Sequence, residues 1–74
     1  MAYCAVGLKT ESGDSYTVLV EYRTILAIPE YLHEILDEEL AYVYDIQVDS
    51  GIDAEEDDKI EALIWKQIEV LKED

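Results

Sequence analysis

Carboxylates are the chemically capable groups that this chain carries in the greatest number. The sequence holds 19 Asp and Glu residues against five Lys and Arg residues, a formal net charge of −14 on 74 residues. From Glu30 to Asp58 there are twelve carboxylates and not one Lys or Arg. Two carboxylates can act as general acid and base only where their environments separate their pKa values. In so acidic a segment close pairs arise by chance, and spacing alone indicates no catalytic pair.

The single histidine and the single cysteine stand in no pattern typical of catalysis. His33 lies between Leu32 and Glu34, which is typical of a surface histidine beside carboxylates. Cys4 falls in the middle of an apolar strand pattern, whereas a nucleophilic thiol needs a basic or helix N-terminal setting that lowers its pKa. We therefore expect no enzyme activity and no cofactor. One cysteine forms no internal disulfide and fits a cytoplasmic location.

The twelve residues from Asp45 to Glu56 have some features of a calcium-binding EF-hand loop. Acids stand at its first, fifth, ninth and twelfth positions: Asp45, Asp49, Asp53 and Glu56. Two departures count against a site, because Ser50 stands where the sharp turn needs Gly and Gln47 stands at the third ligand position. We favour a solvated acidic loop without a metal and keep calcium as the minor alternative.

The elements that would display these groups start with a β-hairpin, predicted over residues 2–9 and 14–25. A loop of Glu11, Ser12 and Gly13 would let Gly13 take the left-handed conformation and would pair Thr10 with Asp14. This register places the apolar side chains on one face: Ala2, Cys4, Val6, Leu8, Tyr16, Val18, Val20 and Tyr22. A shift by one residue would mix apolar and polar side chains on that face.

Two helices and an ambiguous segment follow the hairpin. Pro29 and the spacing of Leu32, Ile35, Leu36 and Leu40 predict a helix over about 29–40. Asp53 with Glu56 resembles a capping box, and an apolar stripe extends that helix over about 53–72: Ile60, Leu63, Ile64, Ile68 and Leu71. Residues 42–48 alternate like a strand, although continuation of the first helix through Tyr44 also fits; we favour the strand.

These elements predict one α+β domain over residues 1–74, ordered ββαβα, or ββαα if the third strand fails. A small antiparallel sheet would be packed with two helices on one face. From the sequence we expect no signal peptide and no membrane-spanning segment. A domain this small has a thin stability margin, and formation of a homodimer would help it.

The acids of the two predicted helices differ in local purpose. Those from Asp53 to Asp58 lie at a helix N-terminus, where negative charge is favourable. Glu30, Glu34 and Glu38 form an i, i+4, i+8 row of like charges, which slightly destabilises its own helix. Residues 30 to 61 hold thirteen carboxylates, the same order of charge as the roughly eighteen phosphates along about 30 Å of DNA. Such a surface can imitate phosphates towards a protein that binds nucleic acid.

In size, charge and the acidic runs PEYLHEILDEEL and DAEEDD, the chain resembles small phage-encoded inhibitors, including anti-CRISPR and other DNA-mimic proteins. The resemblance implies a non-enzymatic protein, in the host cytosol, that blocks a basic nucleic-acid-binding protein such as a CRISPR or other defence effector. Neither nucleic acid nor membrane would be a direct partner, because both carry negative charge. The predicted contact residues are Glu30, Glu34, Asp37, Glu38, Asp53, Glu55, Glu56, Asp57, Asp58 and Glu61, with Trp65 as an aromatic anchor.

The alternative is a structural or regulatory subunit that binds its partner through exposed aromatic patches, with the acids serving only solubility. Tyr31, Tyr42, Tyr44 and Trp65 are the candidates for such patches. This alternative predicts association that tolerates salt, whereas phosphate mimicry predicts association that weakens as salt rises.

Overall fold

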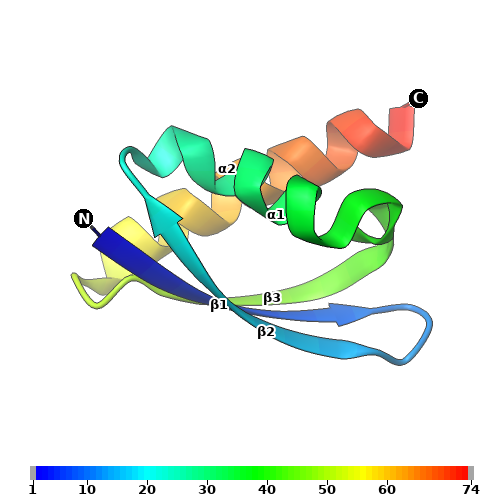
Figure 1. The fold of residues 1–74 in the computed structure, drawn as a ribbon, viewed down its shortest axis with the longest axis horizontal. Coiled ribbons are helices and arrows are strands. Elements are labelled where there is room, and N and C mark those ends of the chain that lie inside the picture. The colour runs from blue at the N-terminus through cyan, green and yellow to red at the C-terminus, as the bar shows by residue number, and fades with distance from the viewer. Residues whose placement is uncertain (1, 74) are drawn as a thin grey trace.

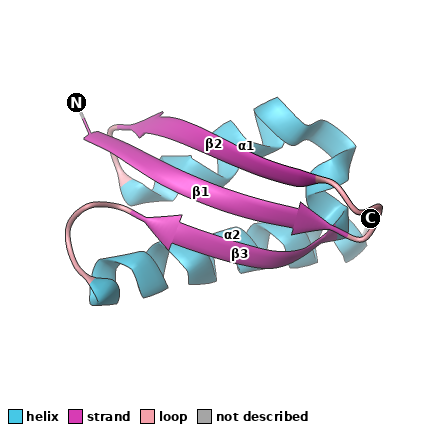
Figure 2. Cartoon of the chain, turned by 90° about the horizontal axis from the view of Figure 1, so that it is seen from below, coloured by secondary structure: helices cyan, strands magenta, loops and turns pink. Residues whose placement is uncertain are grey.

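The computed structural model describes residues 2–73, in which two helices cover one face of a three-stranded antiparallel sheet (Figure 1; Figure 2). The order ββαβα is confirmed. The elements are β1 (Ala2–Thr10), β2 (Ser15–Tyr22), the 3₁₀ helix η1 (Ile25–Ala27), α1 (Ile28–Leu36), the 3₁₀ helix η2 (Asp37–Tyr42), β3 (Val43–Asp49) and α2 (Ala54–Glu73). The strand order is β2-β1-β3, with α1 lying over the β2 side and α2 over the β3 side.

The hairpin has the predicted register, in which Leu8 pairs with Tyr16 and Cys4 with Val20. Gly13 adopts a φ of 93°, and the Thr10 N–H donates to the Asp14 carbonyl at 3.0 Å. The left-handed glycine closes the loop and thereby fixes which side chains face the helices. In the middle of the hairpin the side chains that face the helices are buried, whereas Ala2 at the start of β1 is exposed.

The third strand is present, but its alternation differs from the simple pattern. Lys9 pairs with Asp45 and Thr10 with Val43, so that Tyr44 is an extra residue in a β-bulge. Because a bulge reverses the facing of later side chains, Val43 and Ile46 are both buried whereas Tyr44 is exposed. The simple alternation of residues 42–48 therefore does not hold across the bulge, and Tyr44 does not share the buried face of Ile46.

The first helix is shorter than predicted, because α1 ends at Leu36. Asp37 has φ 53° and ψ −128°, and its N–H donates to the His33 carbonyl as the chain turns into η2. Apart from Pro29 in the first turn, the buried residues of α1 follow one i, i+4, i+8 row, Ile28, Leu32 and Leu36, and Leu40 of η2 continues the core. Ile35, one of the apolar residues whose spacing predicted this helix, is 56 % exposed.

The last helix begins as predicted, and the isoleucines of its predicted apolar stripe lie in the core. The Asp53 Oδ1 atom accepts a hydrogen bond from the Glu56 N–H at 2.8 Å, which caps the helix start. Ile60, Ile64 and Ile68 are fully buried against the sheet and α1. Among the helices of residues 2–73, none combines the length and apolar character needed to cross a membrane.

Candidate functional site

The base-free acidic run lies at the surface. Of its twelve carboxylate residues nine are exposed, and Asp45, Glu56 and Asp57 are half-buried. Folding therefore leaves the charge in contact with solvent, where it is available to a partner.

The acids of this run gather at two ends of the helical layer rather than in one patch (Figure 1). The loop after β3 and the first turn of α2 lie at one end, beside the start of α1, and η2 lies at the other end. The molecule is 30 Å long on its longest axis. The predicted contact residues are therefore spread along the molecule and do not form a single cluster.

The predicted row of Glu30, Glu34 and Glu38 is broken by the turn at Asp37. Glu30 and Glu34 remain neighbours on the exposed side of α1, but Glu38 belongs to η2. Glu38 instead lines a shallow hollow with His33, Ala41, Tyr42 and Leu71. The predicted i, i+8 relation between Glu30 and Glu38 was wrong, because the positive φ of Asp37 ends α1 at Leu36.

Asp37 is the one non-glycine residue of the described chain that has a positive φ. Its φ and ψ of 53° and −128° match the first central position of a type II′ turn, where Gly, Asn and Asp predominate. A residue with a Cβ is strained there by about 1–3 kcal/mol. The strained position coincides with an exposed carboxylate of the predicted contact surface.

The acids around the start of α2 hold the preceding loop in place. The Asp57 Oδ1 atom accepts hydrogen bonds from the Ser50 hydroxyl and from the Ser50 N–H, the latter at 2.9 Å. These two bonds lower the pKa of Asp57 from its ordinary value. The Asp49 Oδ1 atom accepts from the Gly51 N–H at 3.0 Å. Asp49, Asp53 and Asp57 thus have structural roles that do not require a partner.

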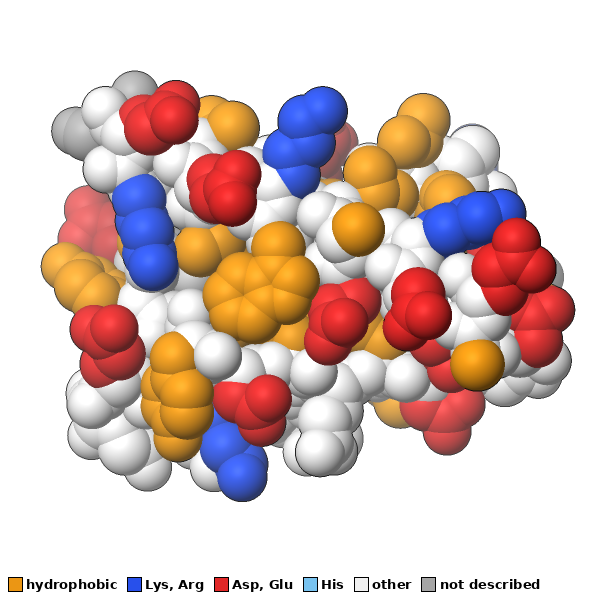
Figure 3. Space-filling view, turned by 180° about the vertical axis from the view of Figure 1, so that it is seen from behind, with side chains coloured by type: hydrophobic (Ala, Val, Ile, Leu, Met, Phe, Trp, Pro, Cys, Tyr) orange, Lys and Arg blue, Asp and Glu red, His pale blue; other side chains and the backbone are white. Residues whose placement is uncertain are grey.

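The exposed side of α2 carries both signs of charge. Glu55 and Asp58 are exposed there together with Lys59 and Lys66. Figure 3, which shows the molecule from the side of α2, has carboxylates interleaved with apolar side chains and with Lys or Arg. From Ile28 to Tyr42, by contrast, five carboxylates are exposed without a base. The α1–η2 side is therefore the more uniformly acidic one.

Trp65 is half-buried and packs against the core, as a side chain that covers a core edge does. Glu61, one turn earlier, is half-buried as well. The aromatic side chains that are exposed are Tyr3, Tyr31, Tyr42 and Tyr44. The tyrosines are thus better placed than Trp65 to act as aromatic anchors.

Two hydrogen bonds join the hairpin to the acidic η2 segment, and one of them is a backbone bond from the Glu11 N–H to the Tyr42 carbonyl at 3.0 Å. The Tyr16 hydroxyl donates to Glu39 Oε2. This bond, and then desolvation, raises the pKa of Tyr16 to about 12. Glu39 consequently links β2 to η2 and differs from its neighbours Asp37 and Glu38, for which no such link is present among the hydrogen bonds of residues 2–73.

The EF-hand interpretation does not agree with the fold. Asp45 and Asp49 lie in β3, with Asp45 paired opposite Lys9, whereas an EF-hand requires these positions in a loop. Asp53 caps α2 through its own side chain. Over residues 2–73, no group of three or more His, Cys, Asp or Glu side chains is placed to hold a metal ion.

Cys4 is fully buried in the sheet, on the face that the helices cover. Burial, and then the nearby Asp57 and Asp49 carboxylates, raise the pKa of its thiol. The shift is opposite in direction to the one that activates a nucleophilic cysteine.

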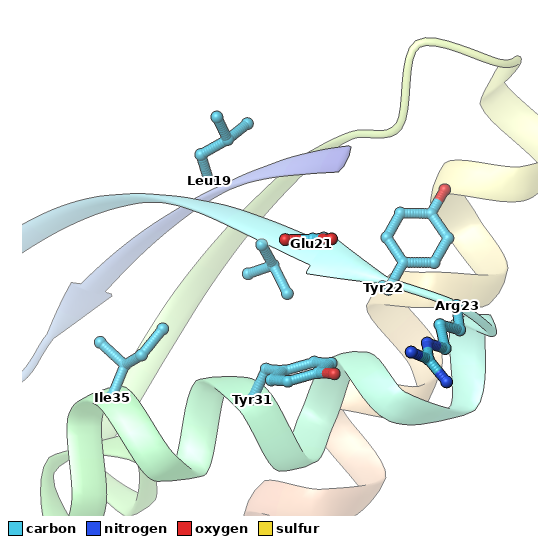
Figure 4. Close-up of a pocket in the computed structure, with 7 residues that line it drawn as sticks. Leu19, Glu21, Tyr22, Arg23, Tyr31 and Ile35 are labelled. Atoms are coloured by element: carbon cyan, nitrogen blue, oxygen red, sulfur yellow. The ribbon is translucent and has the colours of Figure 1, made fainter. Parts of the chain in front are cut away.

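Sequence reasoning missed a groove between the outer edge of β2 and α1 (Figure 4). Exposed apolar side chains from both elements flank it: Leu19, Tyr31 and Ile35. A signal was present, because Leu19 is the one apolar residue on the otherwise polar outer face of β2. Its proximity to α1 could be known only from the way that α1 packs.

The candidate sites are thus exposed acidic and apolar surfaces on a small two-layer α+β fold. No protein-family model, curated protein or solved structure matches the chain.

Proposed function

We propose that this protein is a non-enzymatic, cytosolic inhibitor of a basic nucleic-acid-binding protein. Its carboxylates would occupy the Lys- and Arg-rich surface that otherwise grips phosphates, in the manner of phage-encoded anti-CRISPR and other DNA-mimic proteins. A CRISPR or other defence effector is the kind of partner that this mechanism suits. The steric effect of the bound protein would then prevent nucleic acid from entering.

The observation that carries this proposal is the exposed, base-free acidic surface of α1 and η2. It consists of Glu30, Glu34, Asp37, Glu38 and Glu39. Like charges so close together oppose folding, and Asp37 adds backbone strain. A surface that costs stability in this way supports a role in binding, since solubility requires a much smaller net charge.

The proposal predicts that binding depends steeply on salt. The protein, immobilised on a resin, would be incubated with a bacterial lysate at 0.05 M and 0.3 M NaCl. We expect a nucleic-acid-binding protein to be retained at the lower concentration, to be released at the higher one, and to be displaced by DNA. Retained proteins would be identified by mass spectrometry and tested again in purified form.

Matched variants then separate the acidic surface from charge in general. Charge reversal of Glu34 and Glu38 to Lys should slow association with the purified partner, whereas reversal of Glu69, an exposed acid on α2 outside the run, should have a smaller effect. Equal binding at both salt concentrations, with both sets of reversals harmless, would contradict the proposed function.

Exposed apolar side chains favour the second candidate, a structural or regulatory interaction subunit. Tyr42 and Tyr44 are 58 % and 57 % exposed. Substitution of both by Ser should abolish salt-tolerant association if this candidate holds, while reversal of Glu34 and Glu38 should leave it unchanged.

A further inference from the structure

The groove at the outer edge of β2 has the form of a site for an added strand. It has a volume of about 280 Å³ and is lined by the consecutive residues 19–23 and by Tyr31 and Ile35 of α1. Successive side chains of a strand point to opposite faces of the sheet, so a groove on one face would be lined by every second residue only. A groove lined by all of residues 19–23 must lie along the edge of β2. The groove is therefore bounded by the backbone of β2 on one side and by α1 on the other (Figure 4).

The backbone groups along this edge are directed outward. Thr10 and Asp14 form a hydrogen-bonded pair, and in an antiparallel ladder such pairs alternate with pairs that are not bonded to each other. The even-numbered residues of β2 therefore bond to β1. Thr17, Leu19 and Glu21 present their N–H and C=O groups to the open side, where the strand order leaves β2 without a further strand within residues 2–73.

Apolar side chains flank the edge on both faces of the sheet. Leu19, which is 68 % exposed, lies on the face away from the helices. Tyr31 and Ile35 project from α1 towards the strand. A strand added beside β2 would alternate its side chains between these two surfaces.

The charges around the groove favour a basic occupant over a second copy of this chain. Glu30 and Glu34 precede Tyr31 and Ile35 by one position each and are exposed on the outward side of the same helix. Glu21 lies on the strand, and Arg23 at the groove's end is the one base among its lining residues. Two copies, each with a net charge of −14, would repel one another.

We propose that this edge binds an extended basic segment of the partner protein as a fourth strand. The inference rests on the proposed function and names its mode of recognition. Main-chain hydrogen bonds to Leu19 and Glu21 would supply affinity, and alternate apolar side chains against Tyr31 and Ile35 would supply specificity. Lys or Arg side chains of the segment would lie on the opposite face of the sheet, beside Leu19 and the carboxylate of Glu21, while Glu30 and Glu34 on α1 would add to the negative field around the groove.

The probe for this site is a synthetic peptide, acetyl-Lys-Val-Lys-Val-Lys-Val-Lys-amide, titrated into the ¹⁵N-labelled protein. We expect amide shifts at residues 17–23 and around Ile35, with slower hydrogen exchange of the Leu19 and Glu21 amides. A peptide with Glu in place of Lys should bind more weakly. Shifts confined to η2 or to the first turn of α2, or equal binding of the Glu peptide, would overturn the inference.

Backbone and side-chain controls test the strand geometry itself. Two further peptides carry N-methyl groups either on the valine amides or on the lysine amides. One of them should bind roughly tenfold more weakly than the other, because only one set of N–H groups faces β2. Equal binding of the two would overturn the inference. Ile35→Gln should weaken the parent peptide about fivefold, whereas Val70→Gln, at an exposed apolar position on α2, should not.

The test also distinguishes this inference from the proposed function. If the Glu34 and Glu38 reversals abolish partner binding while the peptide ignores the groove, the added strand is wrong and the acidic mechanism stands. If the Leu19 and Glu21 amides are instead protected from hydrogen exchange in the absence of peptide, and this protection increases with protein concentration, a second copy of the chain occupies the edge. The inference would then be overturned.

Discussion

Replacement of Asp37 by glycine should stabilise this protein, although it removes a side chain from the proposed binding surface. Asp37 ends α1 with φ 53° and ψ −128°, a conformation that glycine adopts without steric cost. The Asp37 side chain is exposed and its surroundings are acidic, because Glu38 and Glu39 follow directly. Glycine would therefore relieve backbone strain and local repulsion together.

The expected gain is about 1 kcal/mol in the free energy of unfolding. Relief of strain contributes about 1–3 kcal/mol, and the greater freedom of glycine in the unfolded chain subtracts about 0.4–1 kcal/mol. Removal of one like charge adds a few tenths of a kcal/mol, roughly as for close charges on a helix. For a domain of this size, 1 kcal/mol raises the thermal midpoint by about 4–8 °C.

Urea and thermal unfolding, followed by circular dichroism, would measure the change. Asp37→Ala is the matched control, because alanine removes the carboxylate but keeps the Cβ atom that causes the strain. We expect Asp37→Ala to remain near the wild-type stability and Asp37→Gly to exceed it. If the two variants were equally stabilised, charge and not backbone strain would be the cause; if glycine destabilised the protein, the reasoning would be refuted.

Three other predictions concern charge and titration. Asp57→Asn should destabilise the protein at neutral pH more than Asp58→Asn does; since the folded pKa of Asp57 is lowered, its contribution is present above the ordinary pKa of 3.8 and should disappear in unfolding measurements as pH falls below it. Glu39→Gln should lower the Tyr16 pKa from about 12 towards 10, as followed by tyrosinate absorbance; the raised folded pKa means that the stabilisation is complete below pH 10 and is lost as pH rises through about 12. Addition of NaCl from 0.01 M to 0.15 M should raise the thermal midpoint, because the Debye length falls from about 30 Å to about 8 Å, well below the 30 Å length of the molecule; an unchanged midpoint would show that repulsion is unimportant.

The acids at the start of α2 and those on α1 have different surroundings in the fold. The acids at the start of α2 have the structural roles that their position predicted, and hydrogen bonds to Ser50 and Glu56 specify them. Glu30 and Glu34, which had no local justification, lie next to the side chains that form the groove beside β2. They therefore stand at the rim of the proposed strand-binding groove.

Local chemistry determined much of the fold from the sequence. Gly13 and the alternation of the hairpin fixed its register, because a slip by one residue would expose the core face. Asp53 and the isoleucine stripe determined the start and the buried side of α2. The excess of carboxylates could be read as a surface property, since unpaired charges are almost never buried.

Tertiary packing decided the features on which recognition depends. The bulge at Tyr44 follows from pairing with β1, which the alternation of residues 42–48 does not reveal. Ile35 continues a helical pattern, yet the sheet accepts only one row of α1 and leaves Ile35 beside the edge of β2. The sequence by itself determined which groups carry charge and which elements form. Only the packing of α1 against β2 decided which acids and apolar side chains share a surface, because residues distant along the chain meet through non-local contacts.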